Sequence, residues 1–334
     1  MPKTPLRYPG GKSRAVETIM PYIRDLDCGE LCSPFLGGGS IELACAKEEI
    51  IVHGYDLFQP LVWFWEALLS NPQKLYKHVG AYRQQVRAYT DKTISTAQWH
   101  KKCSGKCLIT LDHTEFCNHH KKLILIANNK MLGVSKKNFE MCRELANSRT
   151  AVTSQSKLFE AAAQYYIVNR TSFSGATTSG GWSWKASWAR LTQSTLDRLK
   201  EFTVPNFTVA RADFKDSIAA HPEAALYLDP PYCLNESDQP VLDEKGKPID
   251  QETLYGTDGN LHGGFDHVGL SSILKQRSNW VLSYNNCKYI TKLYAGYKIV
   301  PAEWAYGMKN VKDRKDDETS INKMGKSSEI LIIG

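Results

Sequence analysis

Apolar and polar positions at the two ends of the chain follow the pattern of an α/β fold. Short apolar runs at residues 31–35 and 50–56 are each followed by a helical pattern, at residues 40–46 and 60–69. Strands that alternate with helices predict a doubly wound, mostly parallel sheet with helices on both faces. The alternation returns late in the chain, with strands expected at residues 207–210, 224–228, 280–284, 297–300 and 330–333 and helices at 267–275 and 288–294.

The middle of the chain, residues 74–200, is basic and rich in Ser, Thr, Asn and His. It holds 21 Lys and Arg against 7 Asp and Glu, an excess of +14, whereas the remainder carries −7 and the whole chain +7. A regional excess of this size predicts a polyanion, such as nucleic acid, as the partner. We therefore expect a discontinuous α/β domain, residues 1–73 and 201–334, interrupted by a mainly helical recognition domain, residues 74–200.

Other classes of protein are excluded by the ends and the composition of the chain. No run approaches the roughly 18 consecutive apolar residues that a membrane helix requires. Residues 1–5 (Met-Pro-Lys-Thr-Pro) lack the apolar core of a signal peptide, and the nine cysteines are odd in number and scattered. We expect reduced thiols and an intracellular location, either a bacterial cytoplasm or, for a viral protein, the host cell.

A glycine-rich turn and an acidic residue follow the first two predicted strands. Residues 34–40 (Pro-Phe-Leu-Gly-Gly-Gly-Ser) would let the backbone approach a ligand closely, and the helix that follows offers its N-terminus to a negative group. Asp56 lies where nucleotide-binding α/β folds place a carboxylate for ribose hydroxyls. A structural tight turn and a helix cap are the respective alternatives.

A second motif, residues 228–232 (Leu-Asp-Pro-Pro-Tyr), directly follows a predicted strand. The prolines Pro230 and Pro231 fix a rigid, extended corner between an acid and an aromatic ring. The Asp229 carboxylate and the Pro230 carbonyl would accept the two hydrogens of an exocyclic amine on a planar base, while the Tyr232 ring stacks on that base. Such acceptors favour lone-pair density on the amine and prepare it as a nucleophile. A structural turn is the alternative.

In combination these motifs resemble the Dam-type (D12 class) DNA adenine-N6 methyltransferases. The resemblance rests on residues 8–12 (Tyr-Pro-Gly-Gly-Lys), residues 34–40, Asp56 and residues 229–232, in that order. Residues 169–175 (Asn-Arg-Thr-Ser-Phe-Ser-Gly) are similar to the family's Asn-Arg-x-Gly-Tyr-Asn-Gly stretch. This sequence departs from the family with Pro9 in place of the usual Ala, and with Phe-Ser at residues 173–174 in place of Tyr-Asn, which bears on sequence preference.

The resemblance implies methyl transfer from S-adenosylmethionine to N6 of adenine in DNA, without a covalent intermediate or a catalytic metal. Within the implied cofactor pocket, Asp56 would bind the ribose hydroxyls, and Asp213 with Phe214 the cofactor adenine. Residues 229–232 would hold the target base. The full set implied for the cofactor is Tyr8, Lys12, Phe35, Gly37, Gly39, Asp56, Asp213, Phe214 and Asp229.

Chemistry on a base in duplex DNA requires the nucleotide to leave the stack, at a cost of a few kcal/mol. The basic segment would grip the phosphates, and its expected hairpin, residues 171–184, would contact or wedge the bases. For the tryptophans, core packing is the alternative. Residues 233–264 form a long polar stretch that would close over the base or remain disordered. The expected DNA-binding residues are Asn169, Arg170, Phe173, Trp182, Trp184 and Lys185.

A cluster of cysteines and histidines lies inside the basic segment. Cys103, Cys107, Cys117 and His119 could supply the four ligands of a structural zinc, but their spacing matches no finger signature. Ordinary thiols and phosphate-facing histidines are the alternative. A catalytic cysteine is not indicated, because methylation of cytosine C5 typically uses a Pro-Cys pair and the chain contains none.

Double-stranded DNA is therefore the expected partner, with no membrane. The residues leave open whether a cognate restriction endonuclease accompanies the protein, which oligomer it forms, and whether the recognition sequence is GATC. Three other functions stay open. The first is methyl transfer to a protein glutamine or an RNA base, for which Asn more often precedes Pro-Pro. The second is methyl transfer to cytosine N4, for which the motif is more often Ser-Pro-Pro-Tyr. The third is DNA binding without catalysis.

Overall fold

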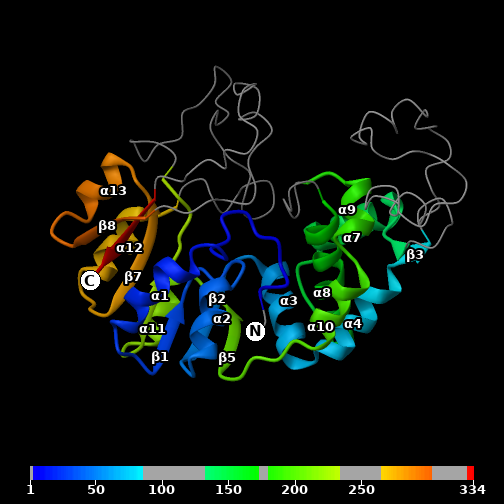
Figure 1. Ribbon diagram of the computed structural model, residues 1–334, viewed down its shortest axis with the longest axis horizontal. Coiled ribbons are helices and arrows are strands. Elements are labelled where there is room, and N and C mark those ends of the chain that lie inside the picture. The colour runs from blue at the N-terminus through cyan, green and yellow to red at the C-terminus, as the bar shows by residue number, and fades with distance from the viewer. Residues whose placement is uncertain (1–2, 86–131, 173–179, 234–264, 303–328) are drawn as a thin grey trace, which may run out of the picture.

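The computed structural model of the protein describes residues 3–85, 132–172, 180–233, 265–302 and 329–334. Its centre is a seven-stranded sheet with the order β5-β2-β1-β6-β7-β9-β8. Figure 1 shows this sheet with its flanking helices on one side of the molecule and a helical part on the other. The strands are β1 (Glu30–Ser33), β2 (Ile51–Asp56), β5 (Phe207–Arg211), β6 (Ala225–Leu228), β7 (Trp280–Asn285), β8 (Lys298–Ala302) and β9 (Glu329–Ile333).

The predicted doubly wound, mostly parallel sheet is confirmed. Strands β5, β2, β1, β6 and β7 pair in parallel, and β9 pairs antiparallel with both β7 and β8. Each predicted strand is present, with ends that differ by only one or two residues. The chain leaves β1 toward β2 on one side and later returns to β6 on the other. The strand order therefore reverses between β1 and β6, where open α/β sheets bind their ligands.

Helices cover both faces of the sheet, because successive residues of its buried strands point to opposite sides. In β6, Tyr227 belongs to one hydrophobic cluster, and its neighbours Leu226 and Leu228 belong to the other. The first cluster packs under α1 (Val16–Arg24), α2 (Ser40–Lys47) and α3 (Gln59–Ser70). The second packs under α11 (Phe214–Ala220), α12 (His267–Leu274) and α13 (Lys288–Leu293).

The middle segment is mainly helical wherever the structure describes it, as the sequence predicts. Its central helix α8 (Gln155–Thr171) is buried along most of its length and packs against α3, with the rings of Phe64 and Tyr166 stacked at 5.3 Å. The helical part therefore continues the first hydrophobic cluster. The domain boundaries at residues 74 and 200 stay a prediction. The helices are α4 (Pro72–Ala81), α7 (Lys136–Ser148), α8 (Gln155–Thr171), α9 (Trp184–Ala189) and α10 (Gln193–Lys200), beside the small sheet of β3 (Gln84–Gln85) and β4 (Leu132–Gly133).

Of the hairpin or loop expected at residues 171–184, the structure describes the base. Ser172 and Trp182 form an antiparallel bridge, and residues 173–179 lie outside the described residues. The predicted bounds are too wide, because Thr171 still belongs to α8 and Trp184 already begins α9. Ser183 ends the hairpin, since its hydroxyl accepts from the amide of Ala186 and caps α9.

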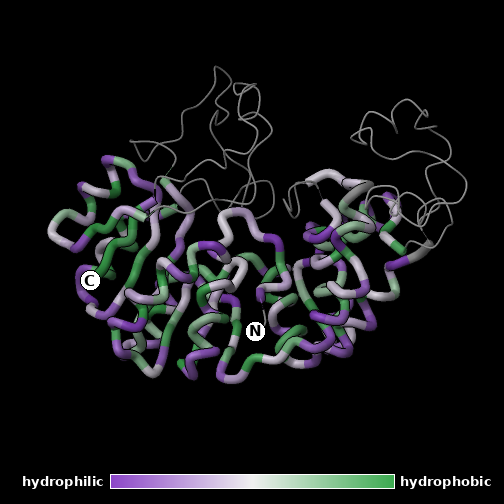
Figure 2. Tube along the Cα trace, in the orientation of Figure 1, coloured by the Kyte–Doolittle hydropathy of each residue, from purple (hydrophilic) through white to green (hydrophobic). Residues whose placement is uncertain are grey.

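Hydropathy follows the layers of the fold. Figure 2 shows that the strands of the sheet are largely hydrophobic, whereas the helices around them combine hydrophobic and hydrophilic residues. No described helix combines the length and the apolar character that crossing a membrane would demand. The cysteines in the described part of the chain are free thiols: Cys28, Cys32, Cys45, Cys142, Cys233 and Cys287.

Candidate active site

A cavity of about 320 Å³ opens at the carboxyl ends of the central strands. It is lined by the turn after β1, by Asp56 at the end of β2, and by Asp229 and Pro231 after β6. The N-terminal residues Tyr8 and Lys12 line it as well. Motifs that are up to about two hundred residues apart in the chain therefore meet at one site, at the point where the strand order reverses.

The glycine turn has a conformation and a packing that favour glycine. Gly37 has a φ of +48° and Gly39 a φ of +67°, both in the left-handed region. A Cβ on Gly37 would lie 2.9 Å from the ring of Tyr8, and one on Gly39 would lie 2.7 Å from the ring of Trp65. The turn thus lets α2 begin at Ser40, directly beside the cavity.

Asp56 is held at the cavity wall by backbone amides. Its carboxylate accepts from the amide of Gly37 at 3.0 Å and from that of Phe58 at 2.8 Å. Burial of the carboxylate nevertheless raises the pKa of Asp56 to about 6. The residue therefore fixes the glycine turn, and it titrates between acidic and neutral pH.

Aromatic rings form another wall of the cavity. The ring of Phe35 stacks on Phe214 at 5.9 Å, and Phe265 meets both rings at 5.4–5.5 Å. Asp213 caps α11, because its carboxylate accepts from the amide of Lys215 at 2.9 Å. Phe265 was missed by sequence reasoning, since it follows a long polar stretch and belongs to no motif.

The acid of the Pro-Pro motif forms a partly buried ion pair with the lysine of the N-terminal motif. Lys12 Nζ lies 2.7 Å and 2.8 Å from the two oxygens of Asp229 and donates to the carbonyl of Gly10 at 3.1 Å. The hydroxyl of Ser283, on β7, donates to the same carboxylate at 2.7 Å. Lys12 is only 4% exposed and Asp229 21%, so the carboxylate is oriented from two sides but still reaches the cavity.

Tyr232 is anchored by an acid that the sequence did not single out. Its hydroxyl donates to Glu329 at 2.5 Å, and its ring lies 5.0 Å below Lys12 Nζ. Glu329, the first residue of β9, is buried and lies 3.9 Å from Lys12 Nζ. Pro230 is buried, which fixes the corner between Asp229 and Tyr232. The Pro-Pro-Tyr motif is thus tied to β9 as well as to β6.

A further buried acid, Glu42, lines the cavity from α2. It accepts from the hydroxyl of Ser33 at 2.6 Å, and burial raises the pKa of Glu42 to about 7. On the sequence, Glu42 is one acid in the first turn of a predicted helix. That position alone gives no sign that the fold buries its side chain against the cavity.

The expected DNA-binding residues of α8 are engaged inside the protein. The side-chain amide of Asn169 donates to the backbone carbonyl of Arg7 at 2.6 Å and accepts from the backbone N–H of Arg7 at 2.9 Å. Asn169 is fully buried. Arg170 donates to the carbonyl of Arg190 at 2.8 Å and to that of Pro5 at 3.4 Å. A direct contact of the Asn169 side chain with DNA would require its bonds to Arg7 to break.

Of the expected hairpin residues, the structure describes the side chain of Trp182. Its ring packs against the first hydrophobic cluster and its indole N–H donates to the carbonyl of Val134 at 3.2 Å, which is the core-packing alternative. Phe173 lies outside the described residues, as do the side chains of Trp184 and Lys185. The same holds for the expected zinc ligands Cys103, Cys107, Cys117 and His119, and for nearly all of the expected lid at residues 233–264.

Comparison with known proteins agrees with this geometry. No curated protein is similar enough to the chain to match it. The sequence model of one protein family matches residues 8–308 of the chain, and this family is described as D12 class N6 adenine-specific DNA methyltransferase. The match runs from the N-terminal motif across the glycine turn, Asp56 and the Pro-Pro-Tyr motif, and so includes all the residues that line the cavity. The chain belongs to the D12 class of adenine-N6 DNA methyltransferases.

Proposed function

We propose that the protein moves a methyl group from S-adenosylmethionine to N6 of an adenine that is flipped out of duplex DNA. One observation carries the proposal: the carboxylate of Asp229 lines the same cavity as the glycine turn and Asp56. An acceptor for a base amine therefore lies beside a pocket with the parts of a nucleoside site. No covalent intermediate is required, because positioning and electrostatics lower the barrier to an in-line transfer.

The cavity fits S-adenosylmethionine by size and by chemistry. Its volume of about 320 Å³ is within the range of small-molecule sites. Asp56 would accept from the ribose hydroxyls, since each carboxylate oxygen keeps acceptor capacity beyond its bond to a backbone amide. Phe214 and Asp213 would hold the adenine. Phe35, whose ring stacks on Phe214, and the glycine turn supported by Tyr8 would lie around the methionine part. When bound, the cofactor supplies an electrophilic methyl group.

The target adenine would be held by the Pro-Pro-Tyr corner. Lys12 and Ser283 already orient Asp229, and a carboxylate has about four acceptor positions, so it can accept from the base amine in addition. The Pro230 carbonyl would take the second amine hydrogen. The Tyr232 ring, anchored through Glu329, would stack on the base. These contacts position the amine and draw its protons toward acceptors as it becomes a nucleophile.

Arginines between the N-terminal segment and the helical part support DNA binding. Arg170 donates to the carbonyl of Arg190, and both side chains carry positive charge near Arg7. Burial and these two charges lower the pKa of Arg7 to about 10. Arg7 as a whole is partly exposed, so a DNA phosphate beside it would offset this positive charge. Residues 74–200 would then act as the recognition domain, with Asn169 positioning Arg7 rather than touching DNA.

Replacing Arg7 by Gln is expected to weaken DNA binding equally for all sequences. The loss of one phosphate contact lowers the slope of log K against log salt concentration by about one. The measurement is fluorescence anisotropy on matched duplexes at several salt concentrations. Arg24→Gln is the control, because Arg24 pairs with Glu48 on the outer side of α1. A loss confined to one DNA sequence would show base reading and contradict a phosphate contact.

Cofactor binding is expected to weaken as pH falls through about 6, because the Asp56 carboxylate then takes up a proton. The protonated carboxyl group has one acceptor oxygen fewer for the ribose hydroxyls. The stability of the free protein should change in the opposite direction. The folded state binds this proton more tightly than the unfolded chain, so stability rises as pH falls toward the unfolded pKa of Asp56. Calorimetric titration of S-adenosylmethionine across this range measures the first effect.

Two variants separate Asp56 from Glu42, whose pKa of about 7 falls in a neighbouring range. In Asp56→Asn the cofactor affinity should be weak and nearly independent of pH around 6. In Glu42→Gln the decrease in affinity below pH 6 should persist. An unchanged pH profile in Asp56→Asn would remove Asp56 from the cofactor site.

The proposed reaction is tested by incubating the protein with S-adenosylmethionine carrying a labelled methyl group. Separate samples contain duplex DNA, RNA and a protein extract. Nucleoside mass spectrometry of the DNA should find N6-methyladenine, and single-molecule sequencing should place it within one recognition sequence. Label on cytosine N4, on RNA or on glutamine would overturn the proposal in favour of a related transfer. Cofactor binding without any transfer would indicate a DNA-binding protein without catalysis.

A further inference from the structure

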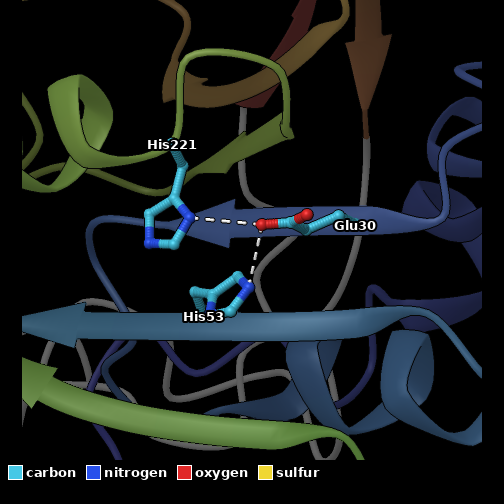
Figure 3. A group of neighbouring side chains, drawn as sticks. All are labelled: Glu30, His53 and His221. Carbon is cyan, nitrogen blue, oxygen red and sulfur yellow. Dashed lines mark hydrogen bonds and ion pairs between the residues drawn. The ribbon is translucent and has the colours of Figure 1, made fainter.

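Three side chains with metal-binding chemistry meet at the amino end of the central strands, away from the cavity. Glu30 is the first residue of β1, His53 lies on β2, and His221 follows the end of α11. Figure 3 shows the two imidazole rings directed at the same carboxylate oxygen. Among the residues that the structure describes, this is the group of His, Cys, Asp or Glu whose ligand atoms gather closely enough for one metal ion.

The spacing of the ligand atoms is close to that of a tetrahedral site. Glu30 Oε1 lies 2.9 Å from His53 Nε2 and 3.2 Å from His221 Nδ1, and all three atoms lie within 4.8 Å of one another. Zinc bonds of about 2.0–2.1 Å in tetrahedral geometry separate two ligand atoms by about 3.3 Å. The rings stack at 4.1 Å with 23° between their planes, so small rotations would bring both nitrogens to one ion.

Each histidine is also oriented from outside, as metal ligands are. His53 Nδ1 lies 3.1 Å from the hydroxyl of Thr208 on β5, and His221 Nε2 lies 2.8 Å from the hydroxyl of Tyr55 on β2. Partners of this kind fix the ring orientation and the tautomer of metal-ligating histidines. The far nitrogen of each ring is therefore held by a hydroxyl, while its near nitrogen faces Glu30.

We propose that Glu30, His53 and His221 bind one divalent transition-metal ion, with Zn²⁺ the best match for two imidazoles and a carboxylate. Mg²⁺ and Ca²⁺ are disfavoured, because they prefer sites built from oxygen ligands. Glu30 is about half exposed, so water can fill the remaining coordination position. The ion would tie the connection between α11 and β6 to strands β1 and β2. Its binding is independent of the proposed methyl transfer.

Metal binding is tested by stripping the tag-free, full-length protein with a chelator and titrating Zn²⁺ against a coloured competitor. The double variant His53→Gln/His221→Gln is expected to lose one bound equivalent and at least about 100-fold in affinity at this site. His78→Gln, a substitution on α4, should bind as the unaltered protein does. Equal binding in the unaltered protein and the double variant would overturn the proposal, as would binding of Mg²⁺ in preference to Zn²⁺.

The cysteines and histidines of residues 103–119 are a second potential source of bound zinc. Replacement of Zn²⁺ by Co²⁺ separates the two, because thiolate ligands add an intense charge-transfer band in the near ultraviolet that imidazole and carboxylate do not. In a Cys103→Ser/Cys107→Ser background, one equivalent of Co²⁺ should still bind with weak visible bands only. Loss of all binding in that background would place the metal at the cysteines and overturn the assignment.

Variants of the outer partners keep the proposal testable if the histidine variants unfold. Thr208→Val and Tyr55→Phe leave all three ligands in place and should each lower Zn²⁺ affinity about 10- to 100-fold. Zn²⁺ should raise the unfolding temperature of the unaltered protein and raise it less in these variants, because a ligand of the folded state stabilises it. Unchanged affinity in both variants would contradict a site built in this way.

Discussion

Replacing Asp229 by Ala is expected to abolish methyl transfer while most of the DNA affinity remains. The carboxylate is the acceptor proposed for the base amine, and loss of one such group aimed at the reacting atoms lowers kcat by about 10²- to 10³-fold or more. DNA affinity should change little, because the phosphate contacts come from the basic segment. Single-turnover methyl transfer and fluorescence anisotropy on the same duplex measure the two effects.

Asp229→Asn is the matched variant, since it keeps the shape of the side chain and removes the charge. It should fold, bind the cofactor and transfer methyl groups far more slowly than the unaltered protein. Ser283→Ala removes one bond that orients Asp229 and should have a smaller effect on kcat than either substitution. Methyl transfer near the original rate in Asp229→Asn would remove the charged carboxylate from the mechanism.

Replacing Lys12 by Met is expected to cost about 3–5 kcal/mol of folding stability, because it leaves buried acids without their cation. Lys12 is 4% exposed, pairs with Asp229 at 2.7 Å and lies 3.9 Å from Glu329. Methyl transfer should also fall steeply, since Asp229 then loses the partner that orients it. Urea denaturation measures the first effect and kcat/KM the second.

The double variant Lys12→Met/Asp229→Asn separates the charge from the packing. Removing both charges should recover part of the stability lost in Lys12→Met, but none of the activity. Lys157→Met is the control for an exposed pair, because Lys157 and Glu160 on α8 face solvent and such pairs contribute at most about 1 kcal/mol. If the two losses of stability simply add, Lys12 and Asp229 are not coupled.

The positions of the strands along the chain and the cavity-lining motifs can be predicted from the sequence because their signals are local. A buried parallel strand is a short apolar run, and a run such as residues 225–228 has that character regardless of its neighbours. Glycine at residues 37 and 39 likewise indicates backbone angles that other residues avoid. The resemblance to a known family then implied that the motifs share one site, and residues from these motifs line one cavity in the structure.

The roles of the polar residues of α8 could not be predicted in the same way. Asn169 and Arg170 belong to a motif, and a motif does not show which way a side chain points. In the fold, α8 is buried along most of its length, so their polar groups find partners on the N-terminal segment and near α9. A buried polar group must be paired, and here the nearest partners are backbone carbonyls.

The sequence by itself determined the α/β pattern, the glycine turn, the rigid Pro-Pro corner and the excess of positive charge, because each depends on residues close together in the chain. Only the tertiary structure decided that Lys12 pairs with Asp229, that Glu329 holds Tyr232, and that two histidines meet Glu30. These contacts join segments far apart in the sequence. Whether such groups meet is set by the packing of whole strands and helices, which no local pattern encodes.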